Sequence, residues 1–196
     1  MSTTVDKKGR RSTAAETRER ILVAARMAFS KAGYDSVGVR EIALAARTDP
    51  AMVSRLFGSK ENLFTLIASE AFRVAAPFDG PVRGMGQRIA ADLLGPVVPP
   101  DPDEFDNFAF LLRSIGSPVA APILSAAIHQ SFIQPLSRRM SGREAEQRAA
   151  LLTAYVLGVA VLRVGLGSPA IERSGPEMVS VLLGEALQRC LTPAIP

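Results

Sequence analysis

The first part of the chain carries apolar residues at the spacing of an amphipathic helix. Between Thr17 and Gly33 they recur at i, i+4, i+7, i+8 and i+11, which places them on one helical face. The residues are Ile21, Ala25, Ala28, Phe29 and Ala32. Glycine readily adopts the left-handed conformation found at helix C-termini, so we expect this helix to end at Gly33.

Two shorter helices are predicted next, over residues 39–46 and 50–57. Asp49 can accept hydrogen bonds from free amides at an N-cap, and Pro50 is tolerated at the first helical position. The third helix is barely two turns long, so packing against the other two must hold it. Three short helices around a tight turn are typical of a helix-turn-helix DNA-binding unit. The expected apolar positions are Val39, Ile42, Ala43 and Ala46, then Val53, Leu56 and Phe57.

The rest of the chain also has a helical pattern. Further helices fit residues 60–75, 85–94, 103–115, 118–140, 143–165 and 176–191, separated by Gly-, Pro- and Asp-rich breaks. No segment shows a convincing period-two alternation bounded by turns. The pattern predicts an all-α protein of about nine helices, with an N-terminal three-helix helix-turn-helix domain and a C-terminal helical domain.

Several motifs in residues 33–61 resemble those of the tetracycline-repressor (TetR) family of bacterial transcription regulators. They are Gly33-Tyr34, Ile42-Ala43, Phe57 and the cap Gly58-Ser59-Lys60-Glu61. The chain departs from the usual family pattern at four positions. Val37 stands where Thr is common and Gly38 where Ser or Thr is common. Arg47 replaces the usual Gly, and Ser54 replaces a frequent Tyr. The resemblance implies a ligand-responsive DNA-binding regulator, a repressor released from a palindromic operator, that dimerises through its last two long helices.

Positive charge is concentrated near the N-terminus. Residues 1–75 carry 13 Lys and Arg against 8 Asp and Glu, whereas the remainder carries 10 against 11. Basic side chains gain affinity for phosphates by releasing condensed counterions, so this end of the chain suits a polyanion. We expect a disordered basic arm at 1–16, a DNA-binding domain at 17–64 and an effector-binding and dimerisation domain at 65–196.

The third helix and its neighbours supply the candidate DNA contacts. Arg55 is the recognition-helix residue able to form a bidentate pair with guanine. Lys60, at the N-terminus of the connecting helix, is expected to hold a phosphate together with free backbone amides. Arg40 and Ser54 are further phosphate or minor-groove candidates. Base reading also falls to Pro50, Ala51 and Met52, with packing as the alternative for Met52.

Polar residues within the apolar C-terminal helices are candidate ligand anchors. An apolar effector needs an apolar lining with a few polar anchors. His129 could equally be a hydrogen-bonded core residue, and Arg113 could be ion-paired or have its charged end in solvent. The candidate anchors are Asn107, Arg113, His129, Gln134 and Tyr155, and the candidate apolar lining is Met85, Phe105, Phe108, Phe110, Phe132 and Met140.

The most apolar run, residues 149–162, is predicted to face both the core and a second subunit. It is shorter than the roughly 20 residues that span a bilayer, and a helix apolar nearly all round must be buried on several sides. No apolar segment of a signal peptide follows the basic N-terminal residues, and the single Cys190 is consistent with a reducing cytoplasm. The expected dimer interface comprises Leu152, Val156, Val159 and Leu162 with Val179, Leu182 and Leu183.

An all-α enzyme and a helical protein-interaction scaffold without sequence-specific DNA binding are the alternatives. One histidine and one cysteine supply no metal cluster, and the sequence has no His-Glu-x-x-His or paired-cysteine motif. We therefore expect no catalysis, no cofactor and no metal. The expected partners are operator DNA, a second copy of the chain and a small molecule.

Overall fold

The fold is all-α, as predicted. The computed structural model describes residues 13–72, 78–96, 101, 104–173 and 176–192, and these residues contain no strand. The π-helical segments η2 and η3 continue their neighbours, so the described residues form ten helical segments. Counting α7, η2 and α8 as one segment and α9 and η3 as another, they are in chain order α1 (Ala14–Ser36), α2 (Val39–Ala45), α3 (Pro50–Phe57), α4 (Lys60–Ala71), α5 (Met85–Leu94), α6 (Asn107–Ser114), α7 (Ala120–Ile128) with η2 (His129–Ile133) and α8 (Gln134–Ser137), α9 (Ala145–Ala160) with η3 (Val161–Gly165), α10 (Pro169–Arg173) and α11 (Pro176–Leu191).

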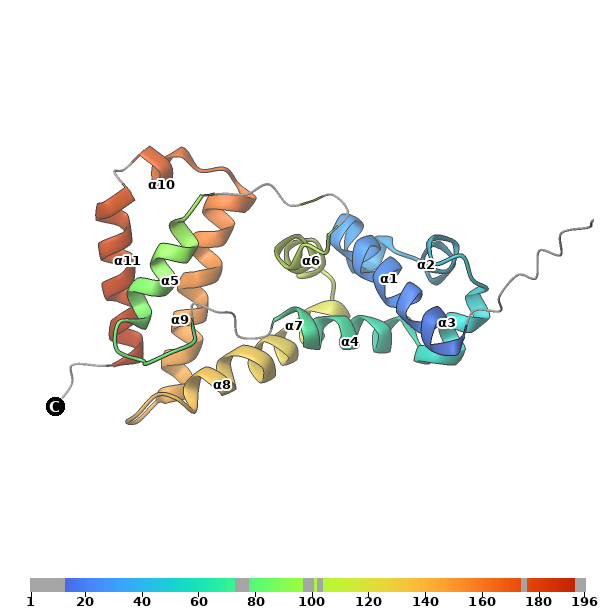
Figure 1. The fold of residues 1–196 in the computed structure, drawn as a ribbon, viewed down its shortest axis with the longest axis horizontal. Helices are drawn as coiled ribbons and strands as arrows, with labels where there is room; N and C mark the ends of the chain where they lie inside the picture. Colours follow the sequence, from blue (N-terminus) through green and yellow to red (C-terminus); the bar gives the residue numbers. More distant parts are fainter. Residues whose placement is uncertain (1–12, 73–77, 97–100, 102–103, 174–175, 193–196) are drawn as a thin grey trace, which may run out of the picture.

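The molecule is elongated (Figure 1). Helices α1, α2 and α3 lie at one end, and α5, α9 and α11 lie side by side at the other. Helices α4, α6 and α7 lie between the two ends. Any coupling between the ends must therefore pass through this middle layer.

Helix α1 begins at Ala14, before the predicted Thr17. Thr13 and Glu16 form a capping box, in which the Glu16 amide donates to the Thr13 hydroxyl at 3.1 Å and the Thr13 amide donates to the Glu16 carboxylate at 3.0 Å. This reciprocal pair satisfies two amides that a helix start leaves free. Residues 14–16 are thus helical, whereas residues 1–12 of the predicted basic arm lie outside the described residues.

Helix α1 breaks at Gly33, where it was expected to end. Gly33 has φ +76° and ψ 173°, and one more turn follows to Ser36. A Cβ atom at Gly33 would lie 2.3 Å from the carbonyl oxygen of Arg113 on α6. Glycine is required here both for its positive φ and for the close approach of the two helices.

Helices α2 and α3 agree with the prediction to within one residue. Ile42, Ala43 and Ala46 are buried as expected. The Ala51 amide donates to the Asp49 carboxylate at 2.7 Å, so Asp49 is the N-cap of α3. The buried face of α2 and the N-cap of α3 were therefore both predictable from the local sequence.

Several C-terminal helices are shorter than predicted. Helix α4 ends at Ala71, α6 begins at Asn107, and α7 begins at Ala120 rather than at residue 118. The start of α6 is set by Asp106, whose carboxylate accepts hydrogen bonds from the amides of Phe108 and Ala109 at 2.9 Å each. The five-residue helix α10 was not expected.

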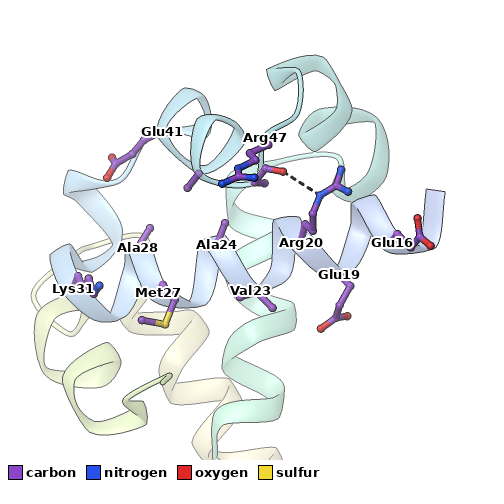
Figure 2. Close-up of a pocket in the computed structure, with 12 residues that line it drawn as sticks. Glu16, Glu19, Arg20, Val23, Ala24, Met27, Ala28, Lys31, Glu41 and Arg47 are labelled. Atoms are coloured by element: carbon purple, nitrogen blue, oxygen red, sulfur yellow. Dashed lines mark hydrogen bonds between the residues drawn. The ribbon is translucent and has the colours of Figure 1, made fainter. Parts of the chain in front are cut away.

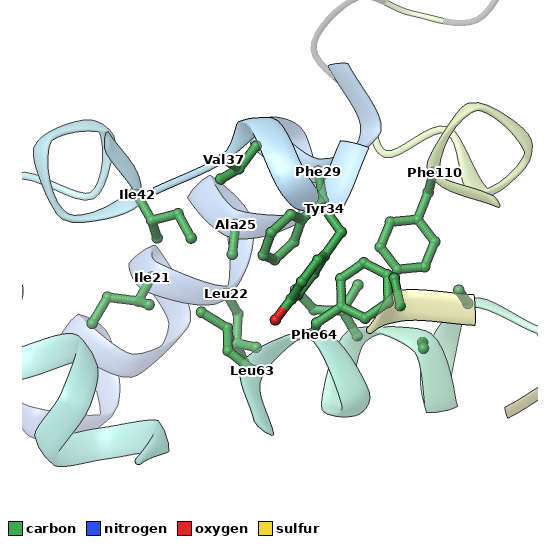
Figure 3. Packing of buried hydrophobic residues seen from close by; sticks show 14 of the residues in the cluster. Ile21, Leu22, Ala25, Phe29, Tyr34, Val37, Ile42, Leu63, Phe64 and Phe110 are labelled. Carbon is green, nitrogen blue, oxygen red and sulfur yellow. The ribbon is translucent and has the colours of Figure 1, made fainter. Parts of the chain in front are cut away.

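The described residues form two hydrophobic cores. The first core joins α1–α4 to α6 and α7. Phe110 of α6 lies among Phe29, Tyr34 and Phe64, which belong to the predicted helix-turn-helix domain, residues 17–64, called the head below (Figure 3). The ring centroids of Phe64 and Phe110 are 4.7 Å apart. Helices α6 and α7 are thus packed as part of the end formed by α1–α3, although they follow it by dozens of residues in sequence.

The second core joins α5, α8, α9 and α11. Helices α5 and α11 approach closely, because a Cβ at Gly86 would lie 2.3 Å from the Gly184 carbonyl oxygen. Gln188 holds the start of α5, accepting from the Gly86 amide and donating to the Val82 carbonyl, both at 3.1 Å. Cys190 lies in this core, and burial raises the pKa of its thiol, an effect that nearby Arg148 opposes.

Candidate nucleic-acid interface and ligand cavity

Helix α3 presents most of the predicted base-reading residues to solvent. Pro50, Ala51, Ser54 and Arg55 are exposed, whereas Met52 is half-buried. The opposite face carries Val53, which is 1% exposed. The helix therefore packs against the protein through the face that carries Val53. The face that carries Arg55 is exposed to solvent and accessible to a DNA groove.

Contacts at both ends position α3 against the rest of the head. Asp49 caps its N-terminus, as described above. Near its C-terminus the guanidinium of Arg18 lies over the Phe57 ring, 5.2 Å from the centroid, in a cation–π contact with α1. A two-turn helix gains its stability from such tertiary contacts.

The turn between α2 and α3 places Arg47 in the left-handed region, with φ +51°. The Thr48 amide donates to the Ala43 carbonyl at 2.9 Å and the Arg47 amide donates to the Leu44 carbonyl at 3.0 Å. This pair of bonds forms a Schellman motif, whose left-handed position usually holds glycine. The conformation that the family pattern assigns to glycine is thus kept here by an arginine, at a conformational cost.

Lys60 has a structural role that the sequence did not suggest. Its ammonium donates to the carbonyl oxygens of Tyr34 and Val37, both at 3.1 Å, and lies 4.0 Å from the centroid of the Tyr34 ring. It thereby ties the start of α4 to the end of α1 and to the loop that follows it. Burial raises the pKa of Tyr34 to about 12, with a further contribution from the neighbouring Glu61 carboxylate, so this ring remains neutral at physiological pH.

Arg40 is exposed on α2, so its guanidinium is accessible to a phosphate. The amide end of α4 is capped by Ser59, whose hydroxyl accepts from the Asn62 amide at 3.1 Å. The structure therefore leaves Arg40 on the surface, while Lys60 is engaged by the protein itself.

A broad groove of about 890 Å³ runs along α1 and α2 in the head (Figure 2). Arg20 crosses it, donating from Nε to the Ala46 carbonyl at 3.2 Å. The charged lining residues are balanced in sign, so the groove favours neither anions nor cations. They are Glu16, Glu19 and Glu41 with Arg20, Lys31 and Arg47.

Hydrogen bonds join α6 and the residues beside it to the end of α1. The Tyr34 amide donates to the Ser114 hydroxyl at 3.2 Å, and the Ser117 hydroxyl donates to the Asp35 carboxylate at 2.8 Å. Arg113, predicted as a ligand anchor, donates instead to the Ser30 carbonyl. These bonds fasten α6 to the head, and sequence reasoning found none of them because the partners are about 80 residues apart.

A second cavity, of about 240 Å³, lies where the two hydrophobic cores meet. Both cores contribute to its apolar lining. The first core contributes Ala71, Phe72, Ile128 and Leu157, and the second core contributes the remaining apolar lining residues. We refer to it as the seam cavity. Its lining consists of Ala71, Phe72, Phe78, Ile89, Asp92, Leu93, Ile128, Phe132, Thr153, Val156 and Leu157.

A π-helical stretch forms part of the wall of the seam cavity. Segment η2 runs from His129 to Ile133 between α7 and α8, and it carries the lining residue Phe132. Wide π turns inside α-helices are frequent at functional sites. The cavity is thus lined by an element whose backbone departs from α-helical geometry.

None of the five predicted ligand anchors lines the seam cavity. Asn107 donates to the Ala71 carbonyl at 2.9 Å, and Arg113 binds α1. His129 lies 3.4 Å from both Gln134 and the Glu146 carboxylate. Tyr155 is on the exposed face of α9. Among the predicted apolar lining residues, Phe132 does line the cavity, whereas Phe110 and Met85 are buried in the two cores.

Helices α9 and α11 carry an exposed apolar face that coincides only in part with the predicted one, since Leu162 and Leu182 are exposed as expected. Leu152 and Leu183 are buried in the protomer's own core, at 0% and 8% exposure, because each turns inward toward α5 and its neighbours. The exposed face, which we call the α9–α11 face, consists of Leu151, Tyr155 and Leu162 with Met178, Val181 and Leu182.

The helix that supplies half of this face, Ala145–Gly165, could cross a membrane by length and composition alone. It has 21 residues, and the mean hydropathy of its most apolar window is 1.5. A single such helix is weak evidence for a membrane span. Arg163 within it donates to the carbonyls of Leu93 and Gly95 at the end of α5, which fixes the helix to the second core.

Comparison with known protein families covers most of the chain. Residues 21–67 match the family model "Bacterial regulatory proteins, tetR family", and residues 84–191 match "Tetracyclin repressor-like, C-terminal domain". A search of curated protein sequences found no significant match.

Solved structures with a similar fold are TetR-family regulators. A TetR-family regulator from Streptomyces coelicolor A3 is 25% identical, with 94% of this chain and 99% of that chain covered and a TM-score of 0.56. NalD from Pseudomonas aeruginosa, the secondary repressor of the MexAB-OprM multidrug efflux pump, is 19% identical, with 93% and 100% covered and a TM-score of 0.62. The chain therefore belongs to the TetR family of bacterial transcriptional regulators, with an N-terminal helix-turn-helix domain and a TetR-type C-terminal domain.

Proposed function

We propose that the protein is a homodimeric repressor whose hold on a near-palindromic operator is weakened by a small molecule in the seam cavity. TetR-family members are DNA-binding regulators rather than enzymes. The observation that carries the proposal is the pairing of an accessible α3 with a cavity placed between the DNA-binding end and the α9–α11 end. We propose that residues 17–64 read DNA, that residues 65–196 bind the effector and dimerise, and that the protein acts in the cytoplasm.

The exposed face of α3 supports a role in base reading. Arg55 offers two parallel donors to guanine, and Ala51 and Pro50 are small enough to meet thymine methyl groups. Ser54 and Arg40 are exposed and would contact phosphates. Lys60 would act on DNA chiefly by holding the loop beside α2 in place, with its remaining donor available to a phosphate.

The α9–α11 face supports dimerisation. Soluble monomers rarely expose large contiguous apolar patches, so a face containing Leu151, Val181 and Leu182 calls for a partner. A second copy of the same face would bury it in an isologous, two-fold symmetric interface. Two α3 helices held by that dimer would enter successive major grooves about 34–36 Å apart, so the operator should be near-palindromic.

The position of the seam cavity supports ligand control. Helix α4 begins at the DNA-binding end and contributes Ala71 to the cavity at its other end. A ligand that prefers a different spacing of the two cores would move α4 and α6 together with the head, and so change the distance between the two α3 helices. The ligand can weaken DNA binding only by its difference in affinity for the two arrangements.

Footprinting of DNA upstream of the protein's own gene, followed by fluorescence anisotropy on the protected site, tests the proposal. We expect a protected near-palindrome, and binding that falls steeply as the salt concentration rises. A scrambled duplex of the same length and composition is the control. Equal affinity for the operator and the scrambled duplex at every salt concentration would contradict sequence-specific reading and favour a scaffold.

A further inference from the structure

The seam cavity is small and largely aromatic. Its volume of about 240 Å³ lies below the roughly 300–1,000 Å³ typical of sites for drug-sized ligands. Phe78 and Phe132 meet edge to face in its wall, with ring centroids 4.7 Å apart, and Phe72 lines it from the end of α4. Such a space fits a compact ligand with an apolar body, of the size of one substituted ring.

One ionised side chain, Asp92, lies in the described lining, and no lysine, arginine or histidine does. Asp92 is exposed, so its carboxylate lies at the edge of the cavity rather than in its depth. The other polar lining residue is Thr153, whose hydroxyl already donates to the Ala149 carbonyl at 2.8 Å and can therefore only accept from a ligand. Both polar groups thus favour a ligand that donates hydrogen bonds.

Two helix C-termini add negative potential at the same place. Ala71 is the last residue of α4, and Asp92 and Leu93 lie in the last turn of α5. The C-terminal end of a helix carries a partial negative charge, about half an elementary charge. Arg163 occupies the Leu93 and Gly95 carbonyls and so offsets part of the α5 contribution, but its side chain does not line the cavity.

We propose that the ligand of the seam cavity is a compact organic amine, protonated and singly charged, with an apolar and preferably aromatic body. The ammonium would lie at the rim beside Asp92, and the apolar body would fill the cavity, packed against the wall that Phe78 and Phe132 form. The negative faces of these rings would add cation–π attraction for the nearby charge. The inference rests on the proposed function, since it specifies the ligand of the same cavity.

A set of probes that differ mainly in charge tests the ligand class. We would titrate the full-length protein at pH 7 by calorimetry with three phenyl compounds. 2-Phenylethylamine is a cation at this pH, 2-phenylethanol is neutral, and 3-phenylpropanoate is an anion. We expect the amine to bind roughly 5- to 30-fold more tightly than the alcohol, because the carboxylate is partly exposed and the ring contact is modest. The carboxylate probe should bind most weakly.

Two variants separate the carboxylate from the net charge of the protein. Asp92→Asn should remove the preference, so that amine and alcohol bind alike. Glu104→Gln removes the same charge at an exposed position outside the cavity lining, and it should keep the preference. Equal binding of amine and alcohol by the wild type, a preference that survives Asp92→Asn, or no binding of the amine would each overturn the proposed ligand class.

Operator binding by the same wild-type preparation distinguishes this failure from failure of the proposed function. Intact, sequence-specific operator binding together with no preference for the amine would reject only the amine. Loss of specific operator binding in ligand-free protein would reject the regulator proposal itself. If both proposals hold, 2-phenylethylamine should also lower operator affinity, and 2-phenylethanol at the same concentration should lower it less.

Discussion

Arg47 shows how a single backbone angle can matter more than a side chain. It occupies the left-handed position of the Schellman motif that ends α2, with φ +51°. A residue with a Cβ atom pays roughly 1 kcal/mol or more for this conformation, whereas glycine does not. The turn of the helix-turn-helix unit is thus held in shape by its hydrogen bonds and by the packing of α2, against the local preference of its own residue.

Arg47→Gly should therefore stabilise the protein relative to Arg47→Ala, by about 1 kcal/mol. Both changes remove the same guanidinium, so their difference isolates the backbone conformation. Urea or thermal unfolding of the two variants measures it. In the interior of a helix alanine is the more stable residue. If Arg47→Ala were as stable as Arg47→Gly or more stable, the turn would not be strained at this position.

Arg55 and Lys60 have opposite kinds of importance for DNA binding. Arg55→Ala should weaken operator binding by about 1–3 kcal/mol, relax one base position and leave the free energy of unfolding nearly unchanged, since the side chain is exposed. Lys60→Ala should lower stability by about 1–3 kcal/mol, because the Tyr34 and Val37 carbonyls lose their donor.

Anisotropy on operator duplexes with single base changes, together with unfolding of the free protein, distinguishes these two roles. Lys60→Ala should also weaken binding to all sequences similarly and flatten its salt dependence. If the two variants lose affinity equally on every duplex and are equally stable, the assignment of Arg55 to base reading is wrong.

Helix α6 is held firmly against the DNA-binding end. It packs on α1 through Phe110 and through the close approach at Gly33. Because the approach is to a backbone carbonyl, no side-chain movement can make room for a larger residue there. The close approach of α1 and α6 thus requires glycine at position 33.

Gly33→Ser should destabilise the protein by more than about 2 kcal/mol, from the positive φ and the clash combined. Gly38→Ser is the matched control, since nothing lies within 4 Å of a Cβ there and its φ of −99° suits any residue. Because Gly38 is the N-cap of α2, a serine at this position should leave the stability of the protein unchanged or raise it by a few tenths of a kcal/mol. Thermal unfolding compares the two variants, and similar Tm values would show that α6 moves away freely.

The α9–α11 face makes a prediction about neighbouring leucines. Leu182 is 59% exposed and Leu183 is 8% exposed. Leu182→Glu should give a folded monomer that no longer binds the operator cooperatively, whereas Leu183→Glu should unfold the second core. Sedimentation and circular dichroism separate the outcomes. A wild-type protein that sediments as a well-behaved monomer at micromolar concentration would refute the proposed dimer.

On the scale of the whole molecule, the described residues form two cores with a cavity between them. Buried residues from Ile21 on α1 to Leu124 on α7 belong to one packed core. We therefore expect α1–α4, α6 and α7 to move together when a ligand fills the seam cavity. Allosteric couplings of this kind are typically about 1–3 kcal/mol. We therefore expect a ligand in the seam cavity to change the position of the head relative to the second core.

Filling the seam without a ligand should reproduce part of the effect. Ala71→Met places a longer side chain at the α4 wall of the cavity, and we expect operator affinity to change roughly 5- to 150-fold. Ala126→Met, at an exposed position of α7 outside the lining, is the control. Unchanged operator affinity in an Ala71→Met protein of normal Tm would show that the seam is not coupled to DNA binding.

The local features of the head were predictable from sequence because their causes are local. The capped start of α3 at Asp49, the buried face of α2 and the positive φ of Gly33 all depend on residues a few positions apart, whereas the contact of Gly33 with α6 does not. Helical periodicity likewise determined the all-α class. The start of α1 was misplaced because a capping box at Thr13 can form beside a polar stretch that otherwise resembles a disordered arm.

Only the tertiary structure decided which faces met. Leu182 and Leu183 are equally apolar in sequence, and the packing of α5 against α11 alone determines that one is exposed and the other buried. Helix α6 joined the head, Lys60 turned to backbone carbonyls, and Asp92 rather than the predicted anchors came to line the cavity. The sequence by itself thus determined the helices and the family to which they belong. Contacts between residues far apart in the chain carry no periodic signal, so the cavity, the α9–α11 face and the division into two cores were decided by packing.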